Sequence, residues 1–249
     1  PKTETMKNVV LTFHNVQDAV WFERTLRLIS RFYSFGTLDQ LYARLSGREL
    51  APRRMCFLSF DDGERSVYEV VFPVLKRLNI PVAMFVSPFN IREGGAFWFQ
   101  RMRQLQPQET EKMKTLPLAD IDRRIETLDP SGATNGDLNI DVPMFEALKK
   151  SGLVTFGAHT QHHPILSNES DDTSHNEIRD SIVDLEQLLG AKVRYFAYPN
   201  GGEKDFSIRE INTLKQCGID MAFSTIPGYA THDDMYAIRR IGLTCGNSL

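Results

Sequence analysis

Two adjacent carboxylates, Asp61 and Asp62, stand at the end of an apolar segment of the chain. They follow residues 55–60 (MCFLSF) and precede Gly63. Carboxylates at the end of an apolar strand stand where barrel enzymes place their active sites. Adjacent side chains of an extended strand point in opposite directions, but a turn at Gly63 would let both face one cavity. The alternative is a solvent-exposed acidic turn, since Asp and Gly are ordinary turn residues.

Three of the six histidines fall within five residues, as His159, His162 and His163. They also follow an apolar segment, and imidazole is a preferred ligand of zinc and related metals. His159 and His163 are four residues apart, so one helical turn would place both on the same face. His162 fits almost as well at a spacing of three, and Pro164 keeps the turn short because it disfavours helical backbone at His163. A histidine-rich surface turn is the alternative interpretation.

Apolar runs and helical patterns alternate along the chain, and the elements that they predict must position the two clusters. Strands are expected where short apolar runs end in polar turns, at residues 9–13, 55–60, 82–86, 153–156, 193–197, 221–224 and 237–243. Helices are expected where apolar residues recur at helical spacing, at residues 21–32, 66–78, 143–150, 176–189 and 206–217. This alternation is typical of a parallel sheet covered on both faces. We therefore expect an α/β fold, a distorted or incomplete (β/α) barrel with seven strands.

Residues 92–141 interrupt this alternation with helical pieces rich in glutamine and charge, followed by a loop at 130–136 (PSGATNG). We interpret them as an insertion between a strand and the next helix, within one catalytic domain that covers residues 1–249. Insertions at such positions often form lids or substrate walls. A helical decoration without function is the alternative.

The composition excludes several classes of protein. The chain has 249 residues, of which 41% are hydrophobic and 24% charged, so it is neither disordered nor fibrous. No apolar run approaches the ~18 residues of a membrane span, and a formal net charge of -3 argues against nucleic-acid binding. Cys56, Cys217 and Cys245 cannot form a closed disulfide framework and lack CxxC spacing. The given chain shows no signal peptide, so we expect a soluble protein of the cytoplasm or the cell envelope. Its oligomeric state stays open.

The two clusters are expected to meet. In a parallel barrel the carboxyl ends of all strands open onto one face, so Asp61 and Asp62 should lie near the histidine cluster. One carboxylate and two imidazoles leave an open coordination position, as a catalytic metal site requires. The second carboxylate then remains free to act as a base.

These motifs resemble those of the polysaccharide deacetylase family, also described as NodB homology or carbohydrate esterase family 4. Residues 57–63 (FLSFDDG) resemble its Thr-Phe-Asp-Asp-Gly motif, with Ser in place of Thr. Residues 159–164 (HTQHHP) resemble its His-Ser/Thr-x-x-His-Pro motif, and 196–201 (FAYPNG) more weakly resemble its Arg-Pro-Pro-Tyr-Gly motif. The resemblance covers most of residues 14–243, without the insertion.

The resemblance implies roles for individual residues. Asp62, His159 and His163 would bind a divalent metal, first of all zinc, with cobalt or nickel as alternatives. Asp61 would be the general base, and the backbone N–H of Asn200 would donate to an oxyanion. Within the third motif, Tyr198 and Pro199 would contact the substrate. His162 would then be an exposed or supporting residue.

Two departures from the family pattern concern the base and the acid. The motif arginine that holds the base aligns with Ala197, and Arg240 could replace it, with Arg194 as a competitor inside a strand. The usual Leu-x-His motif near the C-terminus is missing, but residues 11–14 (LTFH) end the first strand. Because first and last strands are neighbours in a closed barrel, His14 could supply the catalytic acid. This resembles the deacetylases of exopolysaccharide poly-N-acetylglucosamine, which have a permuted motif order; a packed or loop histidine is the alternative.

The resemblance implies a metal-dependent hydrolase that removes N-acetyl groups from amino sugars in a polysaccharide or glycan. A carbohydrate is the expected partner, with neither a nucleic acid nor a membrane span. One alternative is a deacylase of a small sugar-linked or non-sugar amide, and another is a catalytically silent sugar-binding protein. A long groove with exposed aromatic residues at 97–99 (FWF) would favour a polymer, and a pocket closed by the insertion would favour a small molecule.

Overall fold

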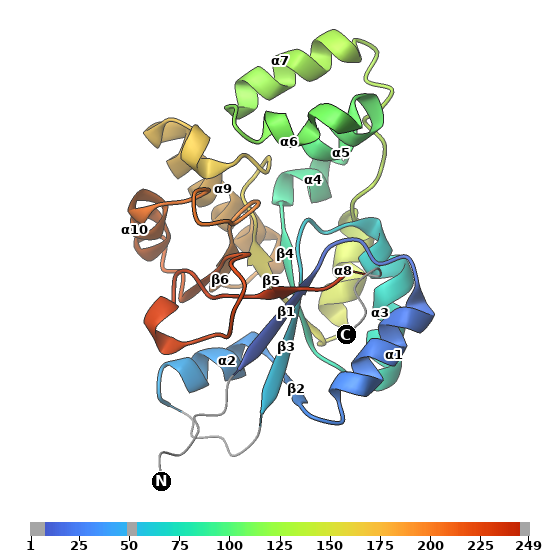
Figure 1. Cartoon of the computed structure of the whole chain (residues 1–249), viewed down its shortest axis with the longest axis vertical. Coiled ribbons are helices and arrows are strands. Elements are labelled where there is room, and N and C mark those ends of the chain that lie inside the picture. The colour runs from blue at the N-terminus through green and yellow to red at the C-terminus, as the bar shows by residue number, and fades with distance from the viewer. Residues whose placement is uncertain (1–7, 49–53, 245–249) are drawn as a thin grey trace.

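Parallel strands form a sheet that curls into an incomplete barrel, as the sequence predicts (Figure 1). The computed structural model describes residues 8–48 and 54–244, so Cys245 lies outside the described residues. Seven strands follow one another in the order β7-β6-β5-β4-β3-β1-β8, and β2 pairs with β3 beside this path. The strands are β1 (Val9–Phe13), β2 (Ser34–Gly36), β3 (Met55–Phe60), β4 (Val82–Val86), β5 (Val154–Ala158), β6 (Tyr195–Ala197), β7 (Met221–Phe223) and β8 (Ile241–Gly242).

The central strands are buried along their whole length and are apolar except at Thr12 and Ser59, because both faces of the sheet are covered. Every residue of β1, β3 and β4 is buried. Alternate residues of these strands enter two different clusters. One cluster, which includes Phe57 and Phe85, fills the barrel interior, and the other, which includes Leu58 and Met84, packs on the surrounding helices. The position of a residue in this alternation therefore decides whether its side chain points into the barrel or towards the surrounding helices.

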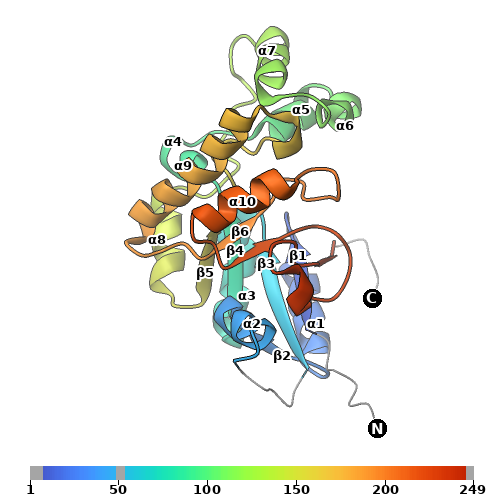
Figure 2. The same cartoon turned by 90° about the vertical axis from the view of Figure 1, so that its left-hand side faces the viewer.

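Helices cover the outer face of the sheet (Figures 1 and 2). A π-helical turn at Val67–Val71 leads into α3, so that Pro73 lies in the first turn, where a missing N–H costs little. The α-helices are α1 (Ala19–Ile29), α2 (Leu38–Leu45), α3 (Phe72–Leu78), α4 (Pro88–Glu93), α5 (Trp98–Leu105), α6 (Thr110–Met113), α7 (Leu118–Leu128), α8 (Val142–Lys150), α9 (Asp171–Leu189) and α10 (Ile208–Gln216). No helix in the described ranges is long and apolar enough to cross a membrane.

Helices α5, α6 and α7 stand beyond the carboxyl ends of the strands, above the sheet in Figure 1. We call residues 97–128 the α5–α7 lobe. The lobe has an apolar cluster of its own, built from Phe97, Trp98, Phe99, Met102, Met113, Ile121 and Ile125. It lies in the chain between β4 and β5, so the same segment that departs from the strand–helix alternation has its own small core.

The last strand differs from its predicted extent. Residues 237–243 are expected as one strand, but only Ile241–Gly242 is a strand, paired with β1. Ile238 instead bridges Phe223 of β7. The segment changes partner from β7 to β1 between these two contacts, and Arg240 turns into the protein at the change. A single bridge therefore joins the two ends of the sheet where a closed barrel would have a full ladder.

Candidate functional site

The turn after β3 brings both aspartates to the same edge of the sheet. The N–H of Asp61 still donates to the carbonyl of Phe13, which extends the pairing with β1 by one residue. Asp62 then adopts a left-handed backbone with φ 70, and Gly63 follows with φ 68. The side chains of Asp61 and Asp62 are 2% and 5% exposed. The solvent-exposed acidic turn is thus the wrong interpretation of this segment.

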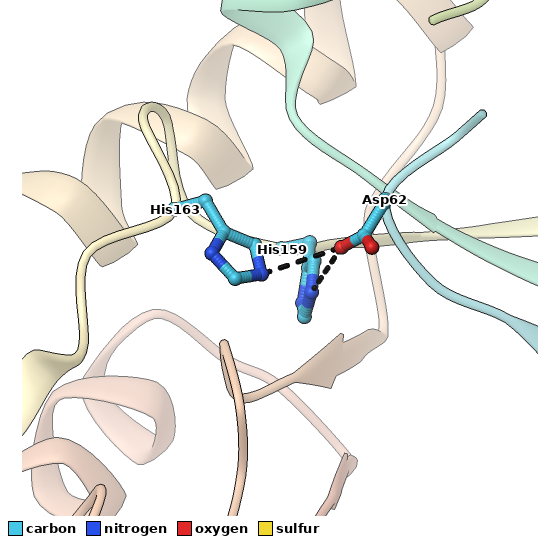
Figure 3. Close-up of side chains that lie close together, drawn as sticks. All are labelled: Asp62, His159 and His163. Atoms are coloured by element: carbon cyan, nitrogen blue, oxygen red, sulfur yellow. Dashed lines mark ion pairs between the residues drawn. The ribbon is translucent and has the colours of Figure 1, made fainter. Parts of the chain in front are cut away.

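Asp62, His159 and His163 converge on a point that could hold a metal ion (Figure 3). Asp62 Oδ1 lies 3.4 Å from His159 Nε2 and 3.3 Å from His163 Nε2. All three potential ligand atoms lie within 4.8 Å of one another, and all three side chains are buried.

The hydrogen bonding of this triad fits a metal site. Asp62 Oδ1 and His163 Nδ1 are buried without a hydrogen-bond partner. Burial raises the pKa of Asp62, but the two imidazoles lower it more, so the carboxylate stays ionised. Burial lowers the pKa of His163 more than Asp62 raises it, which favours the neutral imidazole that binds metals. An ionised carboxylate and a neutral imidazole facing one point form a donor set for a divalent cation.

The two histidines reach Asp62 through a loop and not through a helical turn, which corrects the predicted arrangement. Thr160 and His163 both have left-handed backbones, with φ 64 and φ 59. Thr160 Oγ1 accepts a hydrogen bond from His163 N at 3.1 Å, which holds the loop closed. His159 Nδ1 lies 2.7 Å from the carbonyl of Ala197, so its Nε2 is directed towards Asp62.

Glu177 of α9 holds the same loop from the other side. Its Oε2 accepts hydrogen bonds from the backbone N–H groups of Gln161 and His162, each at 3.0 Å. Its Oε1 lies 2.7 Å from His162 Nδ1 and raises the pKa of that imidazole. The structure therefore places His163, and not His162, beside Asp62. Sequence reasoning missed Glu177, because no motif connects it to the histidines.

Aromatic residues of the α5–α7 lobe pack against His163. Trp98 Nε1 donates to the carbonyl of His163 at 2.9 Å, and the Phe99 ring lies 4.7 Å from the His163 ring. Phe97, Trp98 and Phe99 are only 3%, 4% and 5% exposed. They are not the exposed aromatic platform that the sequence suggested, because they form the core of the lobe and its contact with the histidine loop.

Arg240 holds Asp61 from within the barrel. Its two terminal nitrogens donate to the two oxygens of Asp61, each at 2.7 Å. Arg240 is fully buried, and its remaining donors bond to Ser59 Oγ and the Ser224 carbonyl. Burial raises the pKa of Asp61, but the positive charges of Arg240, His159 and His14 lower the pKa by more. The carboxylate is therefore charged. Arg194, the competing arginine, pairs with Asp220 and does not reach this site.

His14 stands at the mouth of the site. It follows β1, and its Nε2 lies 3.9 Å from Asp61 Oδ2. Its side chain is 50% exposed, so it is not a packed core histidine.

The third motif contributes Asn200 but not its neighbours. Asn200 has a left-handed backbone with φ 58, lines the cavity, and donates no backbone hydrogen bond to any described residue. Tyr198 is fully buried, stacks on Phe206 and donates from its hydroxyl to the Tyr236 carbonyl. Pro199 is also buried and does not line the cavity. Both side chains face the protein and not this cavity, and the substrate contacts expected of Tyr198 and Pro199 stay a prediction.

One cavity of about 350 Å³ gathers these groups. Eight residues singled out in the sequence line it, namely His14, Asp61, Asp62, Trp98, Phe99, His159, His163 and Asn200. The α5–α7 lobe adds two cations, Arg103 and Lys114, which no motif indicated. A charged carboxylate, a cation site and a half-exposed imidazole around one small cavity can together hydrolyse an acyl group.

Comparisons with known proteins identify relatives of this chain. A family model described as polysaccharide deacetylase matches residues 49–222. A curated relative, the poly-beta-1,6-N-acetyl-D-glucosamine N-deacetylase of Staphylococcus epidermidis, is 26% identical over 191 residues. The match covers 76% of this chain and 55% of that protein, so the chain spans about half of the relative's length.

Solved structures share the fold. IcaB from Ammonifex degensii superposes with a TM-score of 0.74 at 22% identity, covering 97% of this chain and 94% of that one. The BpsB deacetylase domain from Bordetella bronchiseptica gives a TM-score of 0.70 at 17% identity, covering 96% of each chain. The deacetylase PplD of Streptococcus pyogenes, solved with acetate, gives 0.69 at 19% identity, covering 95% of this chain and 92% of that one.

Proposed function

Because the chain belongs to the polysaccharide deacetylase family, we propose that it is a metal-dependent hydrolase that removes N-acetyl groups from amino sugars of a glycan. The observation that carries this proposal is the pair of neighbouring arrangements in one cavity, the Asp62–His159–His163 triad and the Asp61 carboxylate held by Arg240. The first substrate to test is poly-β-1,6-N-acetylglucosamine, the glycan in the name of the Staphylococcus epidermidis relative. We also propose that the catalytic unit is one domain in which residues 92–141 are an insertion.

The metal would be held by Asp62, His159 and His163. A divalent cation at this position would polarise the acetyl carbonyl and lower the pKa of a coordinated water. Zinc is our first choice, because an Asp-His-His set with room for a further ligand is a usual catalytic zinc site. Cobalt and nickel take the same donors.

Asp61 would accept the proton of the water that attacks the acetyl carbonyl. The bidentate contact with Arg240 keeps this carboxylate ionised and fixes the direction of its oxygens. His14 lines the same cavity, with its Nε2 3.9 Å from Asp61 Oδ2, and, when protonated, would donate to the nitrogen as the C–N bond breaks. The donated proton is needed because an amine anion is a poor leaving group.

Asn200 would stabilise the negative charge that develops on the carbonyl oxygen. Asn200 lines the cavity, and its backbone N–H has no acceptor among the described residues, as an oxyanion donor requires. The Asn200 carbonyl accepts from Thr225 Oγ1 at 2.6 Å, and Thr225 N donates to Gly201 O at 2.9 Å, so the loop is held before substrate arrives. The products would be acetate and a free amino sugar.

A deacylase of a short amino sugar is the second candidate. It is favoured by the burial of Phe97, Trp98 and Phe99, which removes the exposed aromatic platform on which a long polymer would stack. Chain length of the substrate distinguishes the two functions. A silent sugar-binding protein is disfavoured, because the Asp61–Arg240 pair and the triad are both intact.

The test is acetate release from β-1,6-linked N-acetylglucosamine oligomers by the purified protein. We expect release with added zinc or cobalt, loss with a chelator, and recovery after metal is returned. Absence of acetate from every acetylated amino sugar tried, with metal bound, would overturn the proposed function and leave the silent binder.

A further inference from the structure

The α5–α7 lobe holds the backbone of one residue of the proposed metal site. His163 has a left-handed backbone with φ 59, a conformation that a non-glycine residue keeps only when its surroundings hold it. Its N–H donates to Thr160 Oγ1 at 3.1 Å, and its carbonyl accepts from Trp98 Nε1 at 2.9 Å. Of the two hydrogen bonds that fix this residue, one therefore comes from its own loop and the other from the lobe.

The imidazole of His163 is oriented by aromatic rings and not by a hydrogen bond. A metal-bound histidine ordinarily bonds through its second ring nitrogen to a carbonyl or carboxylate, as His159 Nδ1 does with the carbonyl of Ala197 at 2.7 Å. His163 Nδ1 is buried and has no partner among the described residues. The centres of the Phe99 and Phe97 rings lie 4.7 Å and 5.4 Å from that of the His163 ring. Both rings belong to the lobe, so packing of the lobe decides the direction of this imidazole.

The lobe is docked on the segment that begins with His163. Asn168 Nδ2 donates to the carbonyl of Lys114 at 2.8 Å. Glu169 Oε1 accepts from the N–H of Leu118 at 2.7 Å, at the first residue of α7. Movement of the lobe away from the barrel must break these contacts together with the bond from the tryptophan.

The same lobe forms one wall of the catalytic cavity. Trp98, Phe99, Arg103 and Lys114 all line this cavity. Trp98 and Phe99 thus contact His163 and line the cavity as well. Undocking of the lobe would remove the support of the imidazole and the wall of the cavity at the same time, because the same two residues serve both.

We propose that Trp98 and Phe99 are positioning residues for His163, so that docking of the lobe and binding of the metal favour each other. The inference rests on the metal site of the proposed function and makes the insertion a part of that site. Coupling between two equilibria is reciprocal, so the factor by which docking raises metal affinity is also the factor by which metal stabilises the docked lobe. The metal-loaded protein then holds its cavity wall more firmly than the metal-free protein.

The first measurement is zinc affinity, by competition with a chromogenic chelator. Trp98→Phe keeps an aromatic ring but loses the donor, so the carbonyl of His163 is left unpaired. We expect the affinity to fall by about tenfold, as for loss of one partner of a buried hydrogen bond. Phe99→Leu keeps an apolar side chain but removes the ring beside His163. It should lower the affinity in the same direction, and it replaces Trp98→Phe if that variant fails to fold.

Ile125→Val is the matched control. Ile125 belongs to the same apolar cluster and is 1% exposed, but it lies on α7 and does not line the cavity. The change loosens the core of the lobe and leaves the contacts of His163 in place, so zinc affinity should stay at the wild-type value. Wild-type affinity in both Trp98→Phe and Phe99→Leu would overturn the inference, and so would an equal fall in all three variants.

Hydrogen exchange of the lobe measures the reciprocal effect. We expect saturating zinc to slow amide exchange in residues 97–128 of the wild type by about tenfold, and to slow it less in Trp98→Phe. Unchanged exchange on zinc binding would contradict the coupling. Neither measurement requires turnover, so both decide the inference even if no substrate releases acetate and the proposed function fails. A wild-type protein that binds no zinc would overturn the inference together with the metal site.

Discussion

The guanidinium of Arg240 meets the carboxylate of Asp61 through two parallel hydrogen bonds of 2.7 Å, deep inside the barrel. The two residues are far apart in the chain. Arg240 lies just before the short strand β8 and Asp61 just after β3, so the strand order β3-β1-β8 is what brings them together. An arginine beside the last strand thus holds the first of the two adjacent aspartates in place.

Removing this arginine should weaken both folding and turnover. Arg240→Met leaves the Asp61 carboxylate buried without its partner, which should lower the free energy of unfolding by about 3–5 kcal/mol. Urea denaturation measures this loss, and acetate release measures turnover. Arg194→Met is the control, because Arg194 pairs with Asp220 in a half-exposed position, and such pairs are worth at most about 1 kcal/mol. Equal losses in the two variants would contradict the special position of Arg240.

Asp61 and His159 should separate catalysis from metal binding. Asp61→Asn removes a general base but no metal ligand, so we expect bound zinc to stay near the wild-type amount while kcat falls by about 10²–10⁴-fold. His159→Ala should lose both the metal and the activity. Metal content by mass spectrometry and acetate release distinguish these outcomes. Wild-type turnover in Asp61→Asn would refute the assignment of the base.

Glu177 should control metal affinity without touching the metal. Glu177→Ala frees the N–H groups of Gln161 and His162, so the loop that carries both histidines loses its outer anchor. Supporting residues of this kind change metal affinity by about 10–100-fold. Zinc affinity, measured by competition with a chromogenic chelator, should fall accordingly. Glu186 on the same helix pairs with Lys192, away from the loop. Glu186→Ala should therefore leave the zinc affinity unchanged.

Protonation of Glu210 should lower the stability of the protein in acid. Burial raises its pKa, but hydrogen bonds from Ser174, Ser207 and Arg209 lower it more, so the folded-state pKa lies below its ordinary value of 4.5. A group with a lowered folded pKa stabilises the fold above its unfolded pKa, and this stabilisation disappears as pH falls through the folded value. As the pH falls below about 5 and through the lowered folded-state pKa, the Tm of the wild type should therefore drop more steeply than that of Glu210→Gln. Parallel curves for the two proteins would exclude this contribution.

Much of the fold could be predicted because the central strands are apolar except at Thr12 and Ser59. β1, β3 and β4 were expected at the residues where they occur, since a strand covered on both faces reads as a nearly uninterrupted apolar run. β2 and α2 were not expected. The strand Ser34–Gly36 is only three residues long, and it depends on the first half of β3 for its pairing and not on a pattern of its own.

The candidate site was predictable in its residues more than in its geometry. Local sequence placed His159 and His163 together, but the expected helix was wrong, because backbone conformation in this loop is decided by Thr160, Pro164 and Glu177. The direction of the Tyr198 side chain was also predictable. β6 sends Tyr195 and Ala197 into the barrel interior and Phe196 outward, so alternation also directs Tyr198 outward, onto Phe206.

Five non-glycine residues in the described ranges have left-handed backbones, and four of them lie in the loops of the site: Asp62, Thr160, His163 and Asn200. Such a conformation costs a non-glycine residue about 1–3 kcal/mol, and glycine would relieve it. At Asp62 and His163 glycine cannot relieve the strain without deleting a side chain that we propose as a metal ligand. Selection for heat resistance in a directed-evolution experiment should therefore enrich substitutions in the outer helices and leave Asp62 and His163 unchanged, so that the backbone strain at these two positions persists in every stabilised variant.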